Sequence, residues 1–310
     1  MRMRKSGNWS VSLAVIAVAV SLVVGACWAA ETVGRPRILG IAYVNFLVSD
    51  LDKARAFYGE ELGLPTAVVR NGNFVQASYR VNPYQRIELT KASPGTQGSY
   101  LLEIGLATDD LMKMRTYLTA KGVGRVDDIY AWPDGTRYFV LADPEGNKIV
   151  FIEQKRDSPE SGAVGEISHK LIHAGFIVQN EKTENQFYQD VLGFRPYWHG
   201  GMKDNETNWM SLQVPDGTDW IEYMLKIPAD ADKRLRGVMN HISLGVPSVA
   251  EAAKELKAKG YTGFEEPKIG RDGKWQLNLY DPDMTRVELM EFTPVEKPCC
   301  SEFTGTHPKP

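Results

Sequence analysis

The sequence predicts an α+β protein built from four βαβββ units that are arranged as two pairs. The main observation is an internal repeat. ARAFYGEELGLP at 54–65 recurs as ENQFYQDVLGFRP at 184–196. ADPEGNKIVFIEQ at 142–154 recurs as YDPDMTRVELMEF at 280–292. Two similar segments at matching places in each half indicate that the chain contains the same structural unit more than once.

The second observation is that each half shows an alternating apolar strand followed by an amphipathic helix, and shows this pattern twice. Side chains alternate across a strand with period two, whereas a helix repeats its apolar face every three or four residues. The expected strand–helix pairs are 40–50 with 51–62, 99–110 with 111–122, 169–180 with 181–192, and 239–248 with 249–260.

The repeat also sets the expected domain boundaries. We expect a first domain at 38–154 and a second domain at 167–293. The charged, Ser- and Gly-rich segment KRDSPESGAVGE at 155–166 is the expected linker. The Pro- and Lys-rich end, 294–310, is expected to be a flexible tail.

The amino end has the layout of a secretory signal peptide, which we place at 1–30. A basic start, MRMRKSGNW, precedes the apolar run VSLAVIAVAVSLVVGA, and small residues follow. VGAC also resembles a lipoprotein signal, in which Cys27 would carry the lipid. An uncleaved membrane anchor is the other alternative. We therefore expect export to the periplasm or the medium, with any membrane attachment made through a lipid on Cys27.

Composition narrows the range of partners. The chain has 310 residues, 43% of them hydrophobic, and a formal net charge of -3. That charge and the absence of a Lys/Arg block after the first five residues argue against nucleic acid as a partner. A small-molecule substrate is the expected partner, and a homodimer is left open as the oligomeric state.

Four residues of the second half form the candidate metal site. His173 and His241 are each the third residue in the matching strand segments LIHAGFIV and MNHISLGV, and Glu222 and Glu288 are central in the expected final strands DWIEYML and TRVELME. All four occupy repeat-equivalent positions. Two carboxylates that converge in an apolar sheet repel each other and lose hydration, whereas a divalent ion with two neutral imidazoles and two carboxylates gives a neutral site.

The first half shows that the fold does not demand these side chains. The equivalent positions there hold Tyr43, Glu88, Glu103 and Val150. A hydrocarbon thus stands in the first half where Glu288 stands in the second. Any one of the four candidates, taken alone, is more often a core or surface residue, and the metal prediction depends on the symmetric set.

These features resemble the vicinal oxygen chelate superfamily, which includes glyoxalases, bleomycin-binding proteins and extradiol dioxygenases. The resemblance covers about 38–293 and rests on FYGEELGLP, FYQDVLGF, the two DP hairpins and the candidate ligands. It implies two vicinal-oxygen-chelate domains with curved mixed sheets, the first glyoxalase-like domain with a degenerate site and the second with the metal. It places His173, Glu222, His241 and Glu288 at the family's ligand positions.

The His/Glu/His/Glu order looks most like bacterial lactoylglutathione lyases. The resemblance implies a metal-dependent lyase or isomerase in which one divalent ion (Ni, Co, Mn, Zn or Fe) acts as a Lewis acid on an enediolate. Glu222 or Glu288 would be the catalytic proton shuttle. An extradiol ring-cleaving dioxygenase is the second alternative, for which Glu222 is a surplus ligand. A non-catalytic small-molecule binding protein is the third.

Overall fold

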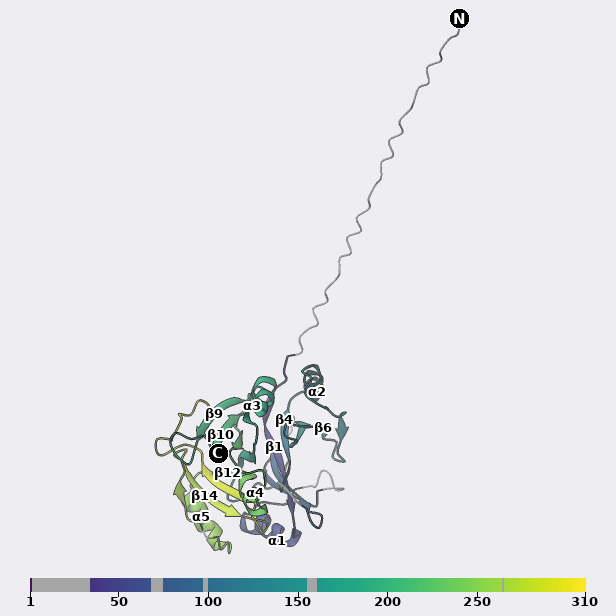
Figure 1. Ribbon diagram of the computed structural model, residues 1–310. Helices are drawn as coiled ribbons and strands as arrows, with labels where there is room; N and C mark the ends of the chain where they lie inside the picture. Colours follow the sequence, from purple (N-terminus) through teal and green to yellow (C-terminus); the bar gives the residue numbers. More distant parts are fainter. Residues whose placement is uncertain (2–33, 68–74, 97–99, 155–160, 264) are drawn as a thin grey trace. The chain divides into compact units, whose positions relative to one another are not determined.

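The computed structural model describes Met1 and residues 34–67, 75–96, 100–154, 161–263 and 265–310 (Figure 1). The expected signal peptide after Met1, Cys27 included, and the first part of the expected linker lie outside the described residues. Within the described part of the chain, no helix is both long enough and apolar enough to cross a membrane.

The first domain is built on one mixed sheet, whose order is β2-β3-β1-β4-β7-β6-β5. In its centre β1 pairs with β3 in parallel and with β4 antiparallel. The described residues of this sheet form seven strands: β1 (Ile38–Val48), β2 (Ala77–Asn82), β3 (Gln85–Lys91), β4 (Leu101–Thr108), β5 (Tyr130–Ala131), β6 (Arg137–Ala142) and β7 (Lys148–Glu153).

The second domain repeats this arrangement with the order β13-β14-β15-β12-β8-β11-β10-β9. Here β8 takes the place of β1: it pairs with β11 in parallel and with β12 antiparallel. The described residues of this sheet form eight strands: β8 (Lys170–Ile177), β9 (Arg195–Gly200), β10 (Trp209–Gln213), β11 (Trp220–Met224), β12 (His241–Val246), β13 (Lys268–Ile269), β14 (Trp275–Tyr280) and β15 (Arg286–Glu291). The predicted α+β class with two domains of curved mixed sheet is confirmed.

The helices begin where the sequence supplies a capping side chain. The Asp50 carboxylate accepts hydrogen bonds from the backbone N–H groups of Asp52 and Lys53, and Ser248 accepts one from Glu251. The described helical segments are α1 (Leu51–Arg55), which continues as the π-helical η1 (Ala56–Glu61), α2 (Leu111–Ala120), α3 (Glu181–Asn185), which continues as the π-helical η2 (Gln186–Val191), α4 (Lys233–Met239) and α5 (Val249–Ala258). Segment α4 has no counterpart among the expected helices.

The repeated Leu-Gly motif ends both π-helical segments. Gly63 and Gly193 follow them with φ of +62° and +77°, a left-handed conformation that favours glycine because it has no Cβ. The chain then turns back toward the sheet, and the phenylalanine and tyrosine of the motif are buried in the core.

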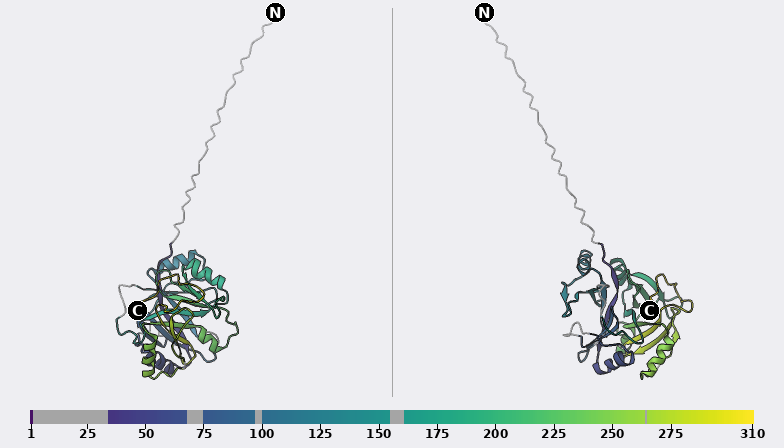
Figure 2. Two further views of the ribbon diagram at one scale, coloured as in Figure 1. Left: turned by 90° about the vertical axis from the view of Figure 1, so that its left-hand side faces the viewer. Right: turned by 180° about the vertical axis from the view of Figure 1, so that it is seen from behind.

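The ribbons of the two domains lie side by side (Figure 2). The domains share one apolar core and a buried polar contact. The amide of Gln85, on β3, donates to the carbonyl oxygens of Ile41 at 3.0 Å and Leu171 at 2.8 Å, and Leu171 N–H donates back to Gln85 at 2.9 Å. Asp219, from the second domain, accepts from the backbone N–H of Ile41 at 2.9 Å. One side chain from each domain therefore binds the backbone of the other.

The carboxyl-terminal segment is packed against the second sheet, which differs from the flexible tail that the sequence predicted. Thr304 N–H donates to the Tyr197 carbonyl at 3.0 Å, and the Gln213 amide donates to Thr306 at 2.8 Å. Phe303 covers the Tyr197 ring with centroids 4.9 Å apart. A disulfide joins Cys299 to Cys300. The prediction rested on the polar composition of the tail and did not consider Phe303, whose ring packs against Tyr197.

Candidate metal centre

The four candidate ligands come from four adjacent strands of the second sheet. His173 lies on β8, Glu222 on β11, His241 on β12 and Glu288 on β15. The registers align them: Gly175, two residues after His173, pairs with both Glu222 and His241. Two residues after His241, Ser243 pairs with Glu288. The alternation predicted from the sequence therefore brings all four side chains to the same region of the sheet.

The four side chains meet within hydrogen-bonding or ion-pair distance. Nε2 of His173 lies 3.0 Å from Nε2 of His241, and Glu222 Oε2 lies 3.5 Å and 4.0 Å from the two nitrogens of His241 and His173. Glu288 Oε2 approaches from another direction, 3.6 Å from His173 Nε2. Of the four candidates, His173, Glu222 and His241 each present one ligand atom within 4.8 Å of the other two. That these residues bind a metal stays a prediction, and the geometry of the site is compatible with it.

Both imidazoles are held in the neutral form. Burial lowers the pKa of His173 well below its ordinary value, and burial followed by the Arg286 charge does the same for His241. Nδ1 of His241 lies 3.1 Å from the Met239 carbonyl oxygen. If Nδ1 carries the proton and donates it there, Nε2 presents a bare lone pair to the cluster.

The space beside His241 depends on a glycine. A Cβ added at Gly175 would lie 2.0 Å from Cε1 of the His241 ring. The imidazole therefore lies against bare backbone on the neighbouring strand. Gly175 is thus part of the site although it offers no ligand atom.

The carboxylates differ in their surroundings. Ser211, opposite Glu222 on β10, donates from Oγ to Glu222 Oε1 at 3.3 Å. Glu288 is 5% exposed, and burial raises the pKa of its carboxyl group to about 8, with Arg286 opposing the shift. A buried carboxyl group of this kind ionises readily only when a positive charge lies close to it.

These residues fit a divalent ion. Two imidazole nitrogens that bind neighbouring positions of one ion, each at about 2.0–2.1 Å, lie roughly 3 Å apart, and the observed separation is 3.0 Å. Neutral imidazoles and carboxylates are also the donors that first-row divalent metals accept. The donor set and its spacing are both what such an ion requires.

Arg286 is a member of the site that the sequence did not single out. Its Nη2 donates to Nε2 of His241 at 2.7 Å. Arg286 precedes Glu288 by two residues on β15, so alternation puts both side chains on the same face of the strand. The two-residue spacing from Glu288 was the sequence feature from which the position of Arg286 could have been predicted. An ion that binds Nε2 of His241 has to displace this guanidinium.

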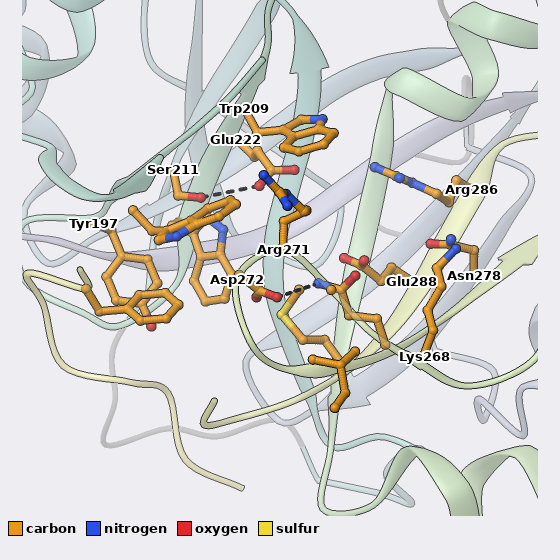
Figure 3. Close-up of a pocket in the computed structure, with 17 residues that line it drawn as sticks. Tyr197, Trp209, Ser211, Glu222, Lys268, Arg271, Asp272, Asn278, Arg286 and Glu288 are labelled. Carbon is orange, nitrogen blue, oxygen red and sulfur yellow. Dashed lines mark hydrogen bonds between the residues drawn. The ribbon is translucent and has the colours of Figure 1, made fainter. Parts of the chain in front are cut away.

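A pocket of ≈ 280 Å³ opens beside the cluster (Figure 3). Figure 3 shows Tyr197 and Trp209 on one side of the pocket and Asn278 and Lys268 on the other. Gln276 and Asn278, both on β14, line the pocket. The aromatic wall as a whole was not predicted from the sequence because its residues come from four separate segments: Tyr197, Trp198, Trp209, Trp220 and Phe303.

Two buried ionisable side chains, Lys274 and Asp272, lie close to the aromatic wall of the pocket. Lys274 is 0% exposed, and its Nζ lies 4.8 Å from the Trp220 ring and 4.9 Å from the Phe303 ring. Burial lowers the pKa of Lys274 to about 8 and raises that of Asp272 to about 6. Asp272 accepts from the Gln276 amide at 2.9 Å. Lys274 thus packs against two rings of the aromatic wall, while Asp272 and Gln276 line the pocket beside it.

The equivalent positions in the first domain are occupied by a different set of contacts. Tyr43 donates its hydroxyl to Glu103 at 3.1 Å, and Lys148 Nζ lies 2.8 Å from the other oxygen of Glu103. Tyr43 and Val150 also belong to an apolar cluster that includes Trp132. The described first domain thus has a tyrosine and an ion pair at positions where the second domain has imidazoles.

Fold and site together define a protein with two paired βαβββ domains, one of which carries a cup of histidines and glutamates. The family model described as Glyoxalase/Bleomycin resistance protein/Dioxygenase superfamily matches residues 40–151 and 170–289. The chain belongs to this superfamily, as the resemblance predicted. A search of the curated proteins found no match.

Solved structures of two kinds share the fold. The Mn(II)-bound glyoxalase from Novosphingobium aromaticivorans is 22% identical, with a TM-score of 0.62 and 83% of each chain covered. The 2,3-dioxygenase LapB from Pseudomonas sp. KL28 is 16% identical, with a TM-score of 0.65, covering 89% of this chain and 96% of that one. A variant of homoprotocatechuate 2,3-dioxygenase from B. fuscum is 18% identical, with a TM-score of 0.64 and coverage of 83% and 72%.

Proposed function

We propose that this protein is an exported, metal-dependent lyase or isomerase of the glyoxalase type. The observation that supports it is the presence of two carboxylates, Glu222 and Glu288, on either side of the paired imidazoles of His173 and His241. A 2-His-1-carboxylate oxygenase site needs only one carboxylate. The second one gives the site a base in addition to its ligands.

A divalent ion held by the four side chains would supply Lewis-acid stabilisation of negative charge that develops on substrate oxygens. The protein's own residues do the rest. Glu288 is buried 3.6 Å from Nε2 of His173 and lines the pocket, so its carboxyl group is placed to take a proton from a bound substrate and return it. Glu222 faces the pocket with one oxygen bound to Ser211, which fixes its orientation. The aromatic wall excludes water from one side.

An extradiol dioxygenase is the second candidate, because the aromatic wall of the pocket suits a planar ring. Tyr280, which could have supplied a phenol to such a reaction, donates its hydroxyl to Glu265 at 2.5 Å and is not among the residues that line the pocket. This weakens the second candidate relative to the first.

Elemental analysis of purified variants tests the metal. We expect about one divalent ion per chain, lost in His241→Ala and retained in Glu103→Ala, which changes the equivalent position of the first domain. An equal loss of metal in both variants would contradict the assignment of the metal site to the second domain. The ion's identity comes from the same measurement.

Turnover then separates the reaction classes. The proposal predicts anaerobic conversion of thiol adducts of α-ketoaldehydes by the metal-loaded protein. Oxygen-dependent ring opening of catechols would assign the dioxygenase instead. A metal-loaded protein that turns over neither substrate is a binding protein. Export is tested by fractionating cells that express the full chain and a chain lacking residues 1–30.

A further inference from the structure

Arg286 is the one cation lining the pocket that has no carboxylate partner among the described residues. Lys268 is paired with Glu265 at 2.9 Å, and Arg271 is paired with Asp204. Among the residues that the structure describes, the only side-chain hydrogen bond of Arg286 goes to the uncharged Nε2 of His241. Its own Nε is buried without a partner. An arginine that is half-buried and not neutralised is costly unless something binds it.

The internal repeat shows how this position is normally neutralised. Lys148 occupies the equivalent place on β7, two residues before Val150, and its Nζ lies 2.8 Å from Glu103. Glu103 in turn is the equivalent of His241. In the second domain a neutral imidazole therefore stands where the first domain has a carboxylate, and the basic side chain beside it loses its counter-ion.

The charge of the loaded site leads to the same conclusion. Two carboxylates, two neutral imidazoles and a divalent ion sum to zero. The buried Lys274 and Asp272 offset each other. Arg286 then leaves one positive charge facing the pocket, and a guanidinium is the group that binds a carboxylate with two parallel hydrogen bonds.

The rest of the pocket specifies the body of the ligand. Trp220 and Tyr197 lie 5.0 Å apart at their centroids, Phe303 lies 4.9 Å from Tyr197, and Trp209 is beside Glu222 in Figure 3. A wall of rings offers flat apolar contact and few hydrogen bonds. Such a wall suits a planar, apolar body more than a flexible polar one.

We propose that Arg286 is a specificity residue that binds the carboxylate of the substrate, and that the pocket takes small molecules that join a carboxylate to a planar apolar body. The inference deepens the proposed function because it concerns the same pocket and names the substrate class. A divalent ion on Nε2 of His241 would displace the Arg286 guanidinium from that atom and leave it available to an anion in the pocket that Arg286 already lines.

Binding of a matched pair of probes tests this proposal. Benzoylformate is a planar carboxylate, and its methyl ester keeps the same body without the charge. Both are titrated into the metal-loaded protein with tryptophan fluorescence as the signal, because three tryptophans line the pocket. Wild type should prefer the anion. Arg286→Gln should lose about 10- to 100-fold in affinity for the anion, the effect of removing one charge-assisted contact, and little for the ester.

Two further variants make the result specific. Arg286→Lys should recover part of the preference because it keeps the charge. Lys148→Gln, at the equivalent position of the first domain, should bind both probes as wild type does. If Arg286→Gln keeps the preference for the anion, or if wild type binds neither probe, the proposal is overturned. The metal content of each sample is measured as well. A wild type that binds no metal would refute the proposed metal-dependent function, and it would not by itself refute the role of Arg286.

Discussion

The hydroxyl of Tyr58 donates a hydrogen bond to Oδ2 of Asp281 at 3.2 Å, across the boundary between the two domains. Its repeat partner, Tyr188, donates to Oδ2 of Asp143 at 3.1 Å in the opposite direction. The tyrosine of each FY motif thus binds the aspartate of the other domain's DP hairpin. The turns of the two hairpins also have a similar backbone conformation. Met284 adopts φ of +65° where the first copy has Gly146 at +88°. The most repeated parts of the sequence are the parts that join the domains.

The first prediction concerns this pair. Tyr58→Phe removes the hydroxyl, while Asp281 still accepts from the backbone N–H groups of Asp283 at 2.9 Å and Thr285 at 2.8 Å. We expect a loss of about 1 kcal/mol in the free energy of unfolding, or roughly 2–4 °C in Tm. Thermal unfolding followed by circular dichroism measures it. Tyr130→Phe, at an exposed tyrosine, is the control, and an equal shift in both variants would show that the contact contributes nothing.

Much of the fold could be predicted because its information is local and repeated. Alternation placed His173 and His241 on the cup face, and the contrast between Val150 and Glu288 showed that the carboxylate serves something other than folding. Each of these inferences needs only strand parity and a comparison of the chain with itself.

The remaining parts of the site depend on contacts between distant segments, which parity cannot supply. Strand parity predicts that Arg286 belongs to the site only once His241 is known to lie beside it. The Tyr58–Asp281 contact joins residues from different halves, and Phe303 reaches the aromatic wall from a tail that reads as polar. Strand order and tertiary packing decide these contacts, and a single sequence does not state them.

The second prediction tests whether the glycine beside His241 is a requirement of the metal site. In Gly175→Ala the new Cβ would lie 2.0 Å from Cε1 of His241, so the ring has to move. We expect metal affinity to fall by about 10- to 100-fold, the range seen when a ligand's supporting contact is lost. Competition with a chelating dye measures this.

Gly245→Ala is the matched control for that variant. Its Cβ would also meet a ring, at 2.3 Å, but that ring is Phe292, which belongs to the apolar cluster of Trp220 and Met290 and is not a candidate ligand. Both substitutions should lower Tm through the clash. Only the first should release metal, and equal affinities in the two variants would contradict the placement of His241 at the site.

The third prediction is a pH dependence that arises at the domain boundary. Glu184 is 0% exposed on α3, beside Asp143 of the other domain, and accepts from the backbone N–H of Glu145 at 3.0 Å. Burial, then the charges of Asp143 and Glu145, raises the pKa of Glu184 from 4.5 to about 8. The hydroxyls of Tyr188 and Tyr223 face the same cluster. The folded protein therefore holds a proton that the unfolded chain releases.

The sign of the effect follows from that difference. A raised pKa in the folded state contributes stability that is complete below about pH 4.5 and is lost as pH rises to about 8. Glu184→Gln resembles the protonated form at every pH. Its Tm should therefore decline less than that of wild type between pH 6 and pH 9, by several degrees. Asp190→Asn, which changes an exposed carboxylate of the adjoining η2, should follow wild type across this range. Parallel curves for Glu184→Gln and wild type would mean that Glu184 is ionised in the folded protein and that the boundary carries no buried proton.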